Sequence, residues 1–230
     1  MTVLMLAPVA LHAVVTALVA DFSDASGVSV ETEVGLNPEI PRRIAEGAAF
    51  DVAITNPGYV VDLVDAGLAD GPSHRAFGRV PLALAVAGET GDAGRRPSEV
   101  ADLLLSAETI AYTGAGTSGR IFREMADRLG VLARIEARLR PMEAGAPIRA
   151  VAAGHTALAV APLTVVQATA GVRAAAICPS GMGTDIEMSV FLSRDAAHRA
   201  DAGKLLSFLT DAGRDESLSR AGVERFTLPA

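Results

Sequence analysis

The first third of the chain alternates between two hydrophobic periods, which predicts strands that are each followed by a helix. Period-two alternation makes Val28–Val34 a half-exposed strand, and the short apolar run Asp51–Ile54 is typical of a buried strand. Asn37-Pro38-Glu39 is a helix start, because it places a capping amide, a proline and an acid in order. This alternation of strands and helices favours an α/β fold with a mainly parallel sheet, whose ligand sites lie at the carboxyl ends of strands.

The same patterns divide the rest of the chain into further strands and helices. The remaining strands and extended runs are predicted at Thr2–Leu6, Phe77–Ala87, Thr109–Tyr112, Thr156–Ala161, Val172–Cys178 and Ile186–Leu192. The remaining helices are predicted at Val9–Phe22, Tyr59–Ala66, Pro97–Leu105, Ile121–Leu129, Leu132–Arg138, Ile148–Ala153, Ala196–Leu209 and Arg214–Ala221. Phe77–Ala87 and Ile186–Leu192 are long enough to carry the chain from one lobe to another and back.

A glycine-rich turn, Thr113–Arg120, separates a predicted strand from a predicted helix. Its glycines permit a tight turn, and Thr117 or Ser118 can cap the helix. A helix that starts in this way presents unpaired N–H groups and the positive end of its dipole, which suits a small anion. Arg120 opposes that dipole in the first turn, so it indicates a further role such as binding a carboxylate. The alternative interpretation is an ordinary N-cap after a glycine turn.

Charge and residue types exclude several classes of function. The formal net charge is −7, from 20 Lys and Arg against 27 Asp and Glu, which argues against non-specific binding to nucleic acid or to anionic membranes. The single cysteine, Cys178, excludes an internal disulfide and is expected to be a buried small hydrophobe. No Cys and His cluster has zinc-site spacing, and no P-loop or dinucleotide fingerprint is present, so we expect neither a metal nor a cofactor.

The apolar start of the chain resembles neither a leader peptide nor a membrane span. Residues 3–20 are interrupted by Pro8 and His12, and they lack a basic leader and a cleavage site. We therefore expect no membrane insertion. The chain as written predicts a soluble cytoplasmic protein, or a periplasmic or other extracytoplasmic one if a leader has been removed.

Four segments in order resemble the solute-binding proteins of ABC importers. Phe22–Val30 is similar to their "F-x-x-x-[ST]-G-x-x-V" segment, and Arg43–Ile54 to their "R-I-x-x-G-x-x-x-D-[VL]-x-I" block. Thr113–Arg120 contains their "G-T-S-G" block. Leu205–Thr210 with Ala221–Val223 resembles their closing helices. The branch most similar to this chain is the molybdate-binding type and its relatives, one of which is aconitate isomerase.

This resemblance implies a two-lobed α/β architecture of the type 2 periplasmic-binding-protein fold, with a ligand cleft between the lobes. The first lobe is predicted to comprise residues 1–81 and 190–230, and the second lobe residues 82–189. The resemblance also implies a small anionic ligand, and an ABC permease or a sensor as the partner that receives it.

The chain departs from the molybdate-binding pattern where the ligand would be held. The serine-rich first loop of those proteins corresponds to Ala7–Leu11, which has no hydroxyl group and contains Pro8, a residue without an N–H. Their second serine loop corresponds to Gly35–Pro38, where only Asn37 offers a side-chain donor. Their late tyrosine falls near Glu187 and Met188. A tetrahedral dianion needs many fixed donors and no nearby carboxylate, so we expect an organic carboxylate rather than molybdate.

The predicted ligand site combines strand-to-helix corners with the glycine-rich turn. Its ligand-binding residues are Asn37, Thr55, Asn56, Thr113, Thr117, Ser118, Gly119 and Arg120. The competing interpretation is that these residues serve only as caps and turn formers.

A second function from a different class is a cofactor-free isomerase of an unsaturated carboxylic acid. The absent export signal and the resemblance to aconitate isomerase motivate this hypothesis. A base must move an allylic proton, and Glu187 or His12 would act as catalytic residue in that case. The start of the helix after Gly116, together with Arg120, would stabilise the dienolate. Whether the protein is an enzyme is therefore open at this point, with binding the favoured function.

Overall fold

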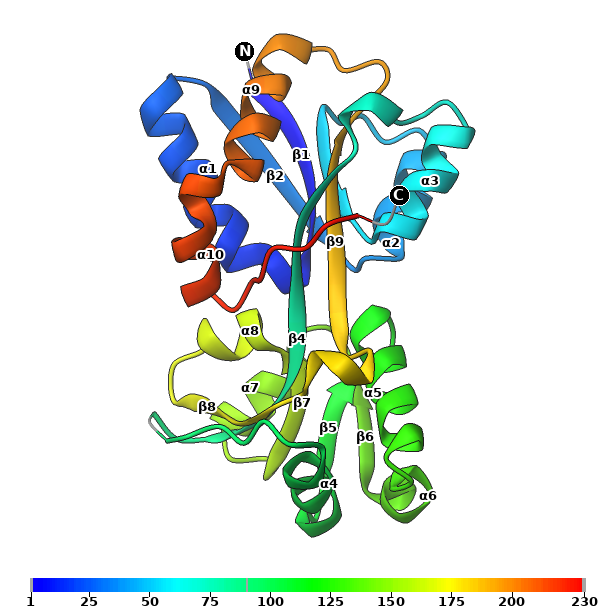
Figure 1. Ribbon diagram of the computed structural model, residues 1–230, viewed down its shortest axis with the longest axis vertical. Helices are drawn as coiled ribbons and strands as arrows, with labels where there is room; N and C mark the ends of the chain where they lie inside the picture. The colour runs from blue at the N-terminus through cyan, green and yellow to red at the C-terminus, as the bar shows by residue number, and fades with distance from the viewer. Residues whose placement is uncertain (1, 90, 229–230) are drawn as a thin grey trace. The chain divides into compact units, whose positions relative to one another are not determined.

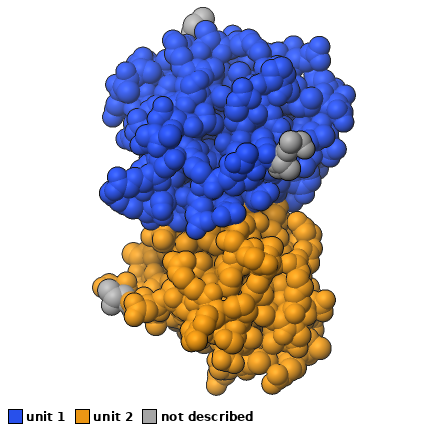
Figure 2. Space-filling model, viewed as in Figure 1, with its two compact units in different colours: residues 1–79, 187–230 blue, residues 80–186 orange. Residues whose placement is uncertain are grey.

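The computed structural model describes residues 2–89 and 91–228 and divides into two compact units (Figure 2). Unit 1 consists of Met1–Arg79 and Glu187–Ala230, and unit 2 consists of Val80–Ile186. The chain passes between the units through two strands, β4 (Arg75–Ala87) and β9 (Asp185–Leu192). β4 contains the long extended run predicted from the sequence, and β9 contains the return segment.

Unit 1 is a three-layer arrangement around a mainly parallel sheet with the strand order β2-β1-β3-β9. β1 (Thr2–Pro8) pairs in parallel with β2 (Ser29–Gly35) and with β3 (Val52–Thr55), whereas β9 is antiparallel to β3. One face carries α2 and α3, and the other carries α1 and α9 (Figure 1). The helices of this unit are α1 (His12–Ser26), α2 (Glu39–Ala45), α3 (Pro57–Asp65), α9 (Arg199–Thr210) and α10 (Asp215–Arg220).

The core of unit 1 explains why these segments fold together. On the α2 and α3 face, a buried cluster joins the sheet to both helices, and its members include Leu6, Ile40, Ile44, Phe50, Ala53, Val60, Leu63 and Phe191. On the other face α1 buries residues at helical spacing, and the Phe22 ring meets Phe208 of α9 edge-on at 5.4 Å. Burial of large apolar side chains of this kind stabilises a fold by about 1.5–3 kcal/mol each.

The segment Val9–Ser26 is the candidate membrane span that length and composition select within residues 2–89 and 91–228. It comprises a short 3₁₀ turn (Val9–Leu11) followed by α1. In this structure Val14, Val15 and Leu18 are buried, and the helix packs against β2 and α9. The segment is thus one layer of unit 1.

The strands of unit 2 follow the order β4-β7-β5-β6, with β8 on the other side of β4. β5 (Ile110–Thr113) pairs in parallel with β6 (Leu139–Met142) and β7 (Leu158–Pro162), while β8 (Val172–Ile177) is antiparallel to β4. The helices of this unit are α4 (Pro97–Ser106), α5 (Thr117–Arg128), α6 (Leu132–Ile135), α7 (Ala146–Ala152) and α8 (Leu163–Gln167). Cys178 follows β8, is 1% exposed as expected, and burial raises the pKa of its thiol to about 12.

Some boundaries and elements differ from the sequence prediction. α2 begins at Glu39, with Pro38 rather than Asn37 at the N-cap position, and the Glu39 carboxylate accepts a hydrogen bond from the Leu36 N–H at 3.0 Å. The predicted helix Leu132–Arg138 divides into α6 and a 3₁₀ turn (Glu136–Arg138). β6 and α8 were not predicted.

Candidate functional site

The carboxyl ends of three parallel strands meet at one edge of the unit 1 sheet. Pro8 of β1 pairs in register with Gly35 of β2, and β3 continues beside β1 to Thr55. Each strand end leads directly into a turn and a helix. The predicted residues Asn37, Thr55 and Asn56 therefore lie at the same edge, where α/β folds place ligand-binding groups.

Thr55 and Asn37 form a buried polar pair at this edge. The Thr55 hydroxyl donates to the Asn37 carbonyl oxygen at 3.1 Å and approaches the Asn37 side-chain Oδ1 at 3.3 Å. Thr55 is fully buried and Asn37 is 5% exposed. The Asn37 side chain does not cap α2, so its predicted cap role is wrong and its amide faces Thr55 instead.

Asn56 connects the β3–α3 corner to the return strand. It has the extended backbone of an N-cap residue, and Pro57 occupies the first turn of α3, but its side chain makes no cap hydrogen bond. Its Nδ2 donates instead to the carbonyl oxygen of Glu187 in β9 at 2.6 Å. This hydrogen bond fixes the position of β9 beside the strand-to-helix corner.

Sequence reasoning missed Ser189, which lies opposite Thr55 in the antiparallel β3–β9 pair. Directly opposed residues point to the same face of a sheet, so Ser189 lies beside the pair of Thr55 and Asn37. Ser189 is fully buried, and its Oγ has no hydrogen-bond partner within the described residues. A buried hydroxyl without a partner is uncommon and costly, which marks the position as one that a ligand could complete. Only strand register, which a single sequence does not give, could have identified it.

Glu187 lies on the same face of the sheet as Ser189, because alternate residues of a strand share a face. Its side chain is exposed. The other candidate base, His12, is the exposed first residue of α1. Among the hydrogen bonds and ion pairs of residues 2–89 and 91–228, none joins Glu187 to His12.

The glycine-rich turn of unit 2 has the strand–turn–helix geometry that the sequence predicted. β5 ends at Thr113 and α5 begins at Thr117. Gly116 at the N-cap position has φ +95°, a conformation that favours glycine. A Cβ atom on Gly119 would lie 2.0 Å from the Thr113 carbonyl oxygen, so only glycine allows the first turn of α5 to approach the strand end.

The other predicted residues of this turn are partly accessible. Thr113, Thr117 and Ser118 are half-buried around the start of α5. Arg120 is exposed and forms an ion pair with Glu124 one turn further along the helix, with 2.7 Å between Nη1 and Oε1. In this conformation its guanidinium is directed along α5 rather than toward the helix start. Within the described residues only Nη1 is engaged, and opening this exposed ion pair to turn the guanidinium toward the helix start would cost less than about 1 kcal/mol.

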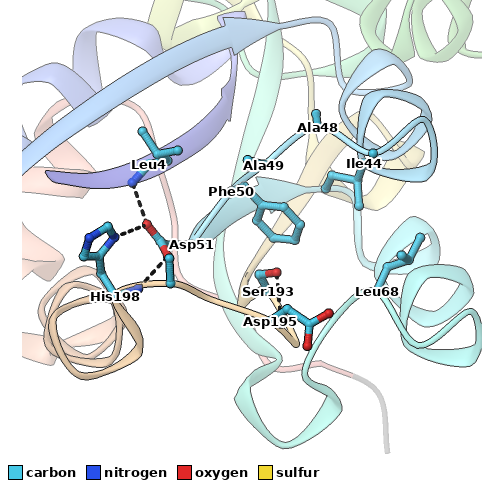
Figure 3. A pocket seen from close by; sticks show the side chains of 12 residues that line it. Leu4, Ile44, Ala48, Ala49, Phe50, Asp51, Leu68, Ser193, Asp195 and His198 are labelled. Atoms are coloured by element: carbon cyan, nitrogen blue, oxygen red, sulfur yellow. Dashed lines mark hydrogen bonds and ion pairs between the residues drawn. The ribbon is translucent and has the colours of Figure 1, made fainter.

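A pocket of about 330 Å³ lies at the other edge of the unit 1 sheet, and none of the predicted site residues contributes to it (Figure 3). It adjoins Asp51, which precedes β3. Burial of the Asp51 carboxyl opposes ionisation, but hydrogen bonds from the Leu4 and His198 N–H groups and from the His198 ring outweigh it and hold the pKa of Asp51 below its usual value. No group of three His, Cys, Asp or Glu side chains in the described ranges is placed to hold a metal ion.

Comparisons with known proteins give a consistent result. A family model described as bacterial extracellular solute-binding protein matches residues 3–224. The periplasmic molybdate-binding protein of Azotobacter vinelandii superposes with a TM-score of 0.82 at 17% identity, over 99% of this chain and 100% of that one. The sulfate-binding protein SubI of Mycobacterium tuberculosis H37Rv gives a TM-score of 0.72 at 14% identity, over 96% and 86% of the two chains.

A third similar structure is PEB3 of Campylobacter jejuni with bound L-phospholactate, with a TM-score of 0.70 at 10% identity over 97% of this chain and 100% of that one. Comparison with curated protein sequences gave no match. At these identities the structural matches speak for the fold alone, and they confirm the α/β class predicted from the sequence.

Proposed function

Because the chain belongs to the bacterial extracellular solute-binding protein family, we propose that it is the substrate-binding component of an ABC-type importer for a small organic carboxylate. The observation that carries this proposal is the buried polar group at the carboxyl edge of unit 1. Ser189 supplies a hydroxyl there that no group in residues 2–89 and 91–228 bonds, beside Thr55 and Asn37. A ligand with hydrogen-bonding oxygens would satisfy the Ser189 hydroxyl and offset the cost of its burial.

The residues at this edge favour an organic acid over a tetrahedral dianion. The loop after β1 begins with Pro8, which has no N–H to donate, and it contains no hydroxyl side chain. Glu187 lies on the same face as Ser189, and its negative charge opposes a dianion more strongly than a single carboxylate.

Two sets of groups take part in this proposal, one in each unit. In unit 1 they are Asn37, Thr55, Asn56 and Ser189. In unit 2 they are Thr113, Thr117, Ser118, Gly119 and Arg120, where the first-turn N–H groups and the dipole of α5 suit a carboxylate. Each charge-assisted hydrogen bond would contribute about 1.5–3 kcal/mol to binding.

The test is calorimetric titration with small mono-, di- and tricarboxylates, phospholactate, molybdate, tungstate and sulfate. We expect one or more organic acids to bind, and the variant Ser189→Ala to weaken that binding about tenfold or more while the unfolding midpoint changes little. Ser207→Ala in α9 of the same unit is the control, because the exposed Ser207 hydroxyl already donates to the Gly203 carbonyl oxygen at 2.9 Å. Binding of molybdate or sulfate alone would contradict the choice of an organic acid.

The proposed place of action is outside the cytoplasmic membrane, where the protein would deliver its ligand to a permease. The family description supports this location. Fractionation of the source cells, with detection of the protein by antibody, tests it. Recovery with the cytoplasmic enzymes would contradict the proposed role in import.

One observation also favours the isomerase as a second candidate function. The Glu187 carboxylate lies on the face of the sheet that carries Ser189, so a proton acceptor lies beside the proposed carboxylate site. His12 is the other candidate base. Proton NMR of cis- and trans-aconitate in deuterated water tests the reaction. Binding without isomerisation or deuterium uptake would reject the enzyme and leave the binding function.

A further inference from the structure

The pocket at the amino edge of β3 is separate from the proposed solute site. All of its lining residues belong to unit 1, and they are Leu4, Ile44, Gly47, Ala48, Ala49, Phe50, Asp51, Leu68, Ser193, Asp195, Ala197 and His198. β3 runs from Val52 beside this pocket to Thr55 at the other edge, which is about 10 Å of strand at roughly 3.3 Å per residue. The volume of about 330 Å³ lies in the range of pockets that hold small molecules.

One wall of the pocket is apolar and held rigidly. Ile44 and Phe50 belong to the buried cluster of unit 1, and Leu68 packs against it. The Phe50 ring meets the Phe191 ring edge-on, with 5.8 Å between the centroids. In Figure 3 this ring lies between the Asp51–His198 pair and Leu68. The wall is therefore formed before any ligand arrives, which lowers the entropic cost of binding.

The Asp51 carboxylate is already used by the protein. Its Oδ1 accepts from the His198 N–H at 3.0 Å, and its Oδ2 accepts from the Leu4 N–H at 2.9 Å and faces His198 Nδ1 at 3.2 Å. With both oxygens engaged, Asp51 organises the end of the pocket and leaves little capacity for a ligand.

Asp195 is the acid of the pocket that is available to a ligand. Its backbone N–H donates to Ser193 Oγ at 3.3 Å, which holds the loop that carries its side chain. The side chain is exposed and forms no ion pair with the described residues. Among the described residues no lysine or arginine lines the pocket, so its charged groups there are the two aspartates and, when protonated, His198. An apolar wall beside a carboxylate without a counterion matches an organic cation.

We propose that this pocket binds a small primary ammonium compound whose apolar group rests on Phe50, Ile44 and Leu68 while its ammonium group pairs with Asp195. The Ser193 hydroxyl, which also lines the pocket, offers a further acceptor to such a group, which has three N–H donors. The binding is independent of the carboxylate site at the other edge of the sheet.

The experiment uses the full chain and three probes of nearly the same shape, namely benzylammonium, benzyl alcohol and benzoate. Titrations are followed by the methyl NMR signals of Ile44 and Leu68 and by calorimetry. We expect benzylammonium to shift these methyl signals and to bind at least fivefold more tightly than benzyl alcohol, with benzoate the weakest.

Three variants separate the contributions to binding. Asp195→Asn should weaken benzylammonium binding at least threefold and leave benzyl alcohol binding unchanged. Asp62→Asn, at an exposed position of α3 outside the pocket, is the matched control and should change neither. Ala48→Leu, which fills the pocket, should weaken both probes.

Equal affinities for the three probes, an Asp195→Asn variant that binds benzylammonium like the original protein, or methyl shifts confined to other regions would each overturn the proposal. The carboxylate titrations with Ser189→Ala are read separately, so failure of one site leaves the other standing.

Discussion

At the scale of single residues, two kinds of constraint dominate the candidate site. Gly119 is required by space, because a Cβ atom would lie 2.0 Å from the Thr113 carbonyl oxygen. Space does not explain the other two residues. Ser189 has a buried hydroxyl without a hydrogen-bond partner among the described residues, and Glu187 carries an exposed charge beside it. Packing therefore explains the glycine, whereas our proposal assigns the serine and the glutamate to the ligand site.

Gly119→Ala should destabilise the protein by about 2–3 kcal/mol, because the start of α5 must move away from the end of β5. Urea unfolding measures this change. Gly203→Ala in α9 is the matched control, since nothing lies within 4 Å of its added Cβ, and it should stabilise by about 0.5–1 kcal/mol. Similar effects of the two substitutions would show that the close approach at Gly119 is not a constraint.

Glu187→Gln should raise the affinity for anionic ligands about two- to tenfold, because it removes a like charge beside Ser189 while keeping the shape. The same variant should abolish any proton exchange into bound aconitate. Glu31→Gln on β2 is an exposed control that should change neither property. Weaker anion binding in Glu187→Gln would mean that this carboxylate helps to hold the ligand.

At the scale of elements, a few polar side chains join segments that lie far apart in the sequence. Asp51 connects the start of β1 and the start of α9 through its hydrogen bonds to Leu4 and His198. Arg225 similarly holds the C-terminal segment, donating to the Phe77 carbonyl oxygen at 2.6 Å and to the Leu209 carbonyl oxygen at 3.1 Å, with Asp215 at 2.8 Å.

Asp51 should make the free energy of unfolding depend on pH in the acid range. Its pKa is lowered in the folded protein, so the unfolded state binds the proton more readily. The stabilisation is complete above the unfolded pKa of about 3.9 and is lost as the pH falls through the lower folded value. Asp51→Asn should therefore cost about 2 kcal/mol at pH 7 and show a flatter pH dependence below pH 4. Urea unfolding from pH 3 to 7 tests this, and parallel curves for the two proteins would contradict it.

Arg225→Ala should destabilise the protein by about 2–3 kcal/mol, because it leaves the Phe77 and Leu209 carbonyl groups without a donor. Arg225→Lys should restore only part of this loss, since a single ammonium group cannot reach the same acceptors as the guanidinium fork. Thermal unfolding of the three proteins gives the comparison. If Arg225→Lys is as stable as the original protein, the positive charge of Arg225 matters and its hydrogen bonds do not.

At the scale of the whole molecule, the family and the fold agree while the ligand is decided by local chemistry. Proteins described with molybdate, sulfate and L-phospholactate share this fold at 10–17% identity. The fold alone therefore does not fix the ligand, and our proposal assigns its selection to the residues at the strand ends and at the start of α5. A ligand that binds the folded state and not the unfolded state must also stabilise the folded protein.

A true ligand at about a hundred times its dissociation constant should raise the free energy of unfolding by roughly 2.7 kcal/mol. Ser189→Ala in unit 1 and Thr117→Ala with Ser118→Ala in unit 2 should each reduce the stabilisation at the same ligand concentration. A thermal-shift series over ligand concentration measures it. If only the variants of one unit reduce the stabilisation by the ligand, the site lies in that unit.

Local sequence patterns are enough to predict the alternation of strands and helices, the long extended runs and the strand–turn–helix geometry at Gly116, because hydrophobic period and glycine conformation are local properties. These patterns do not predict β6, because it contains Pro141, which is tolerated only on an edge strand such as this one. They also do not predict α8, because Leu163–Gln167 is rich in β-branched residues, which favour strands.

Which polar side chains meet depends on how distant segments pair and pack. Asn56 and Glu187 are 131 residues apart and are joined by a hydrogen bond, and the same strand pairing places Ser189 opposite Thr55. The pocket beside Asp51 likewise needs β1, β3 and the loop before α9 together. Strand register and loop docking depend on contacts summed over the whole fold, so no local pattern in a single sequence specifies them.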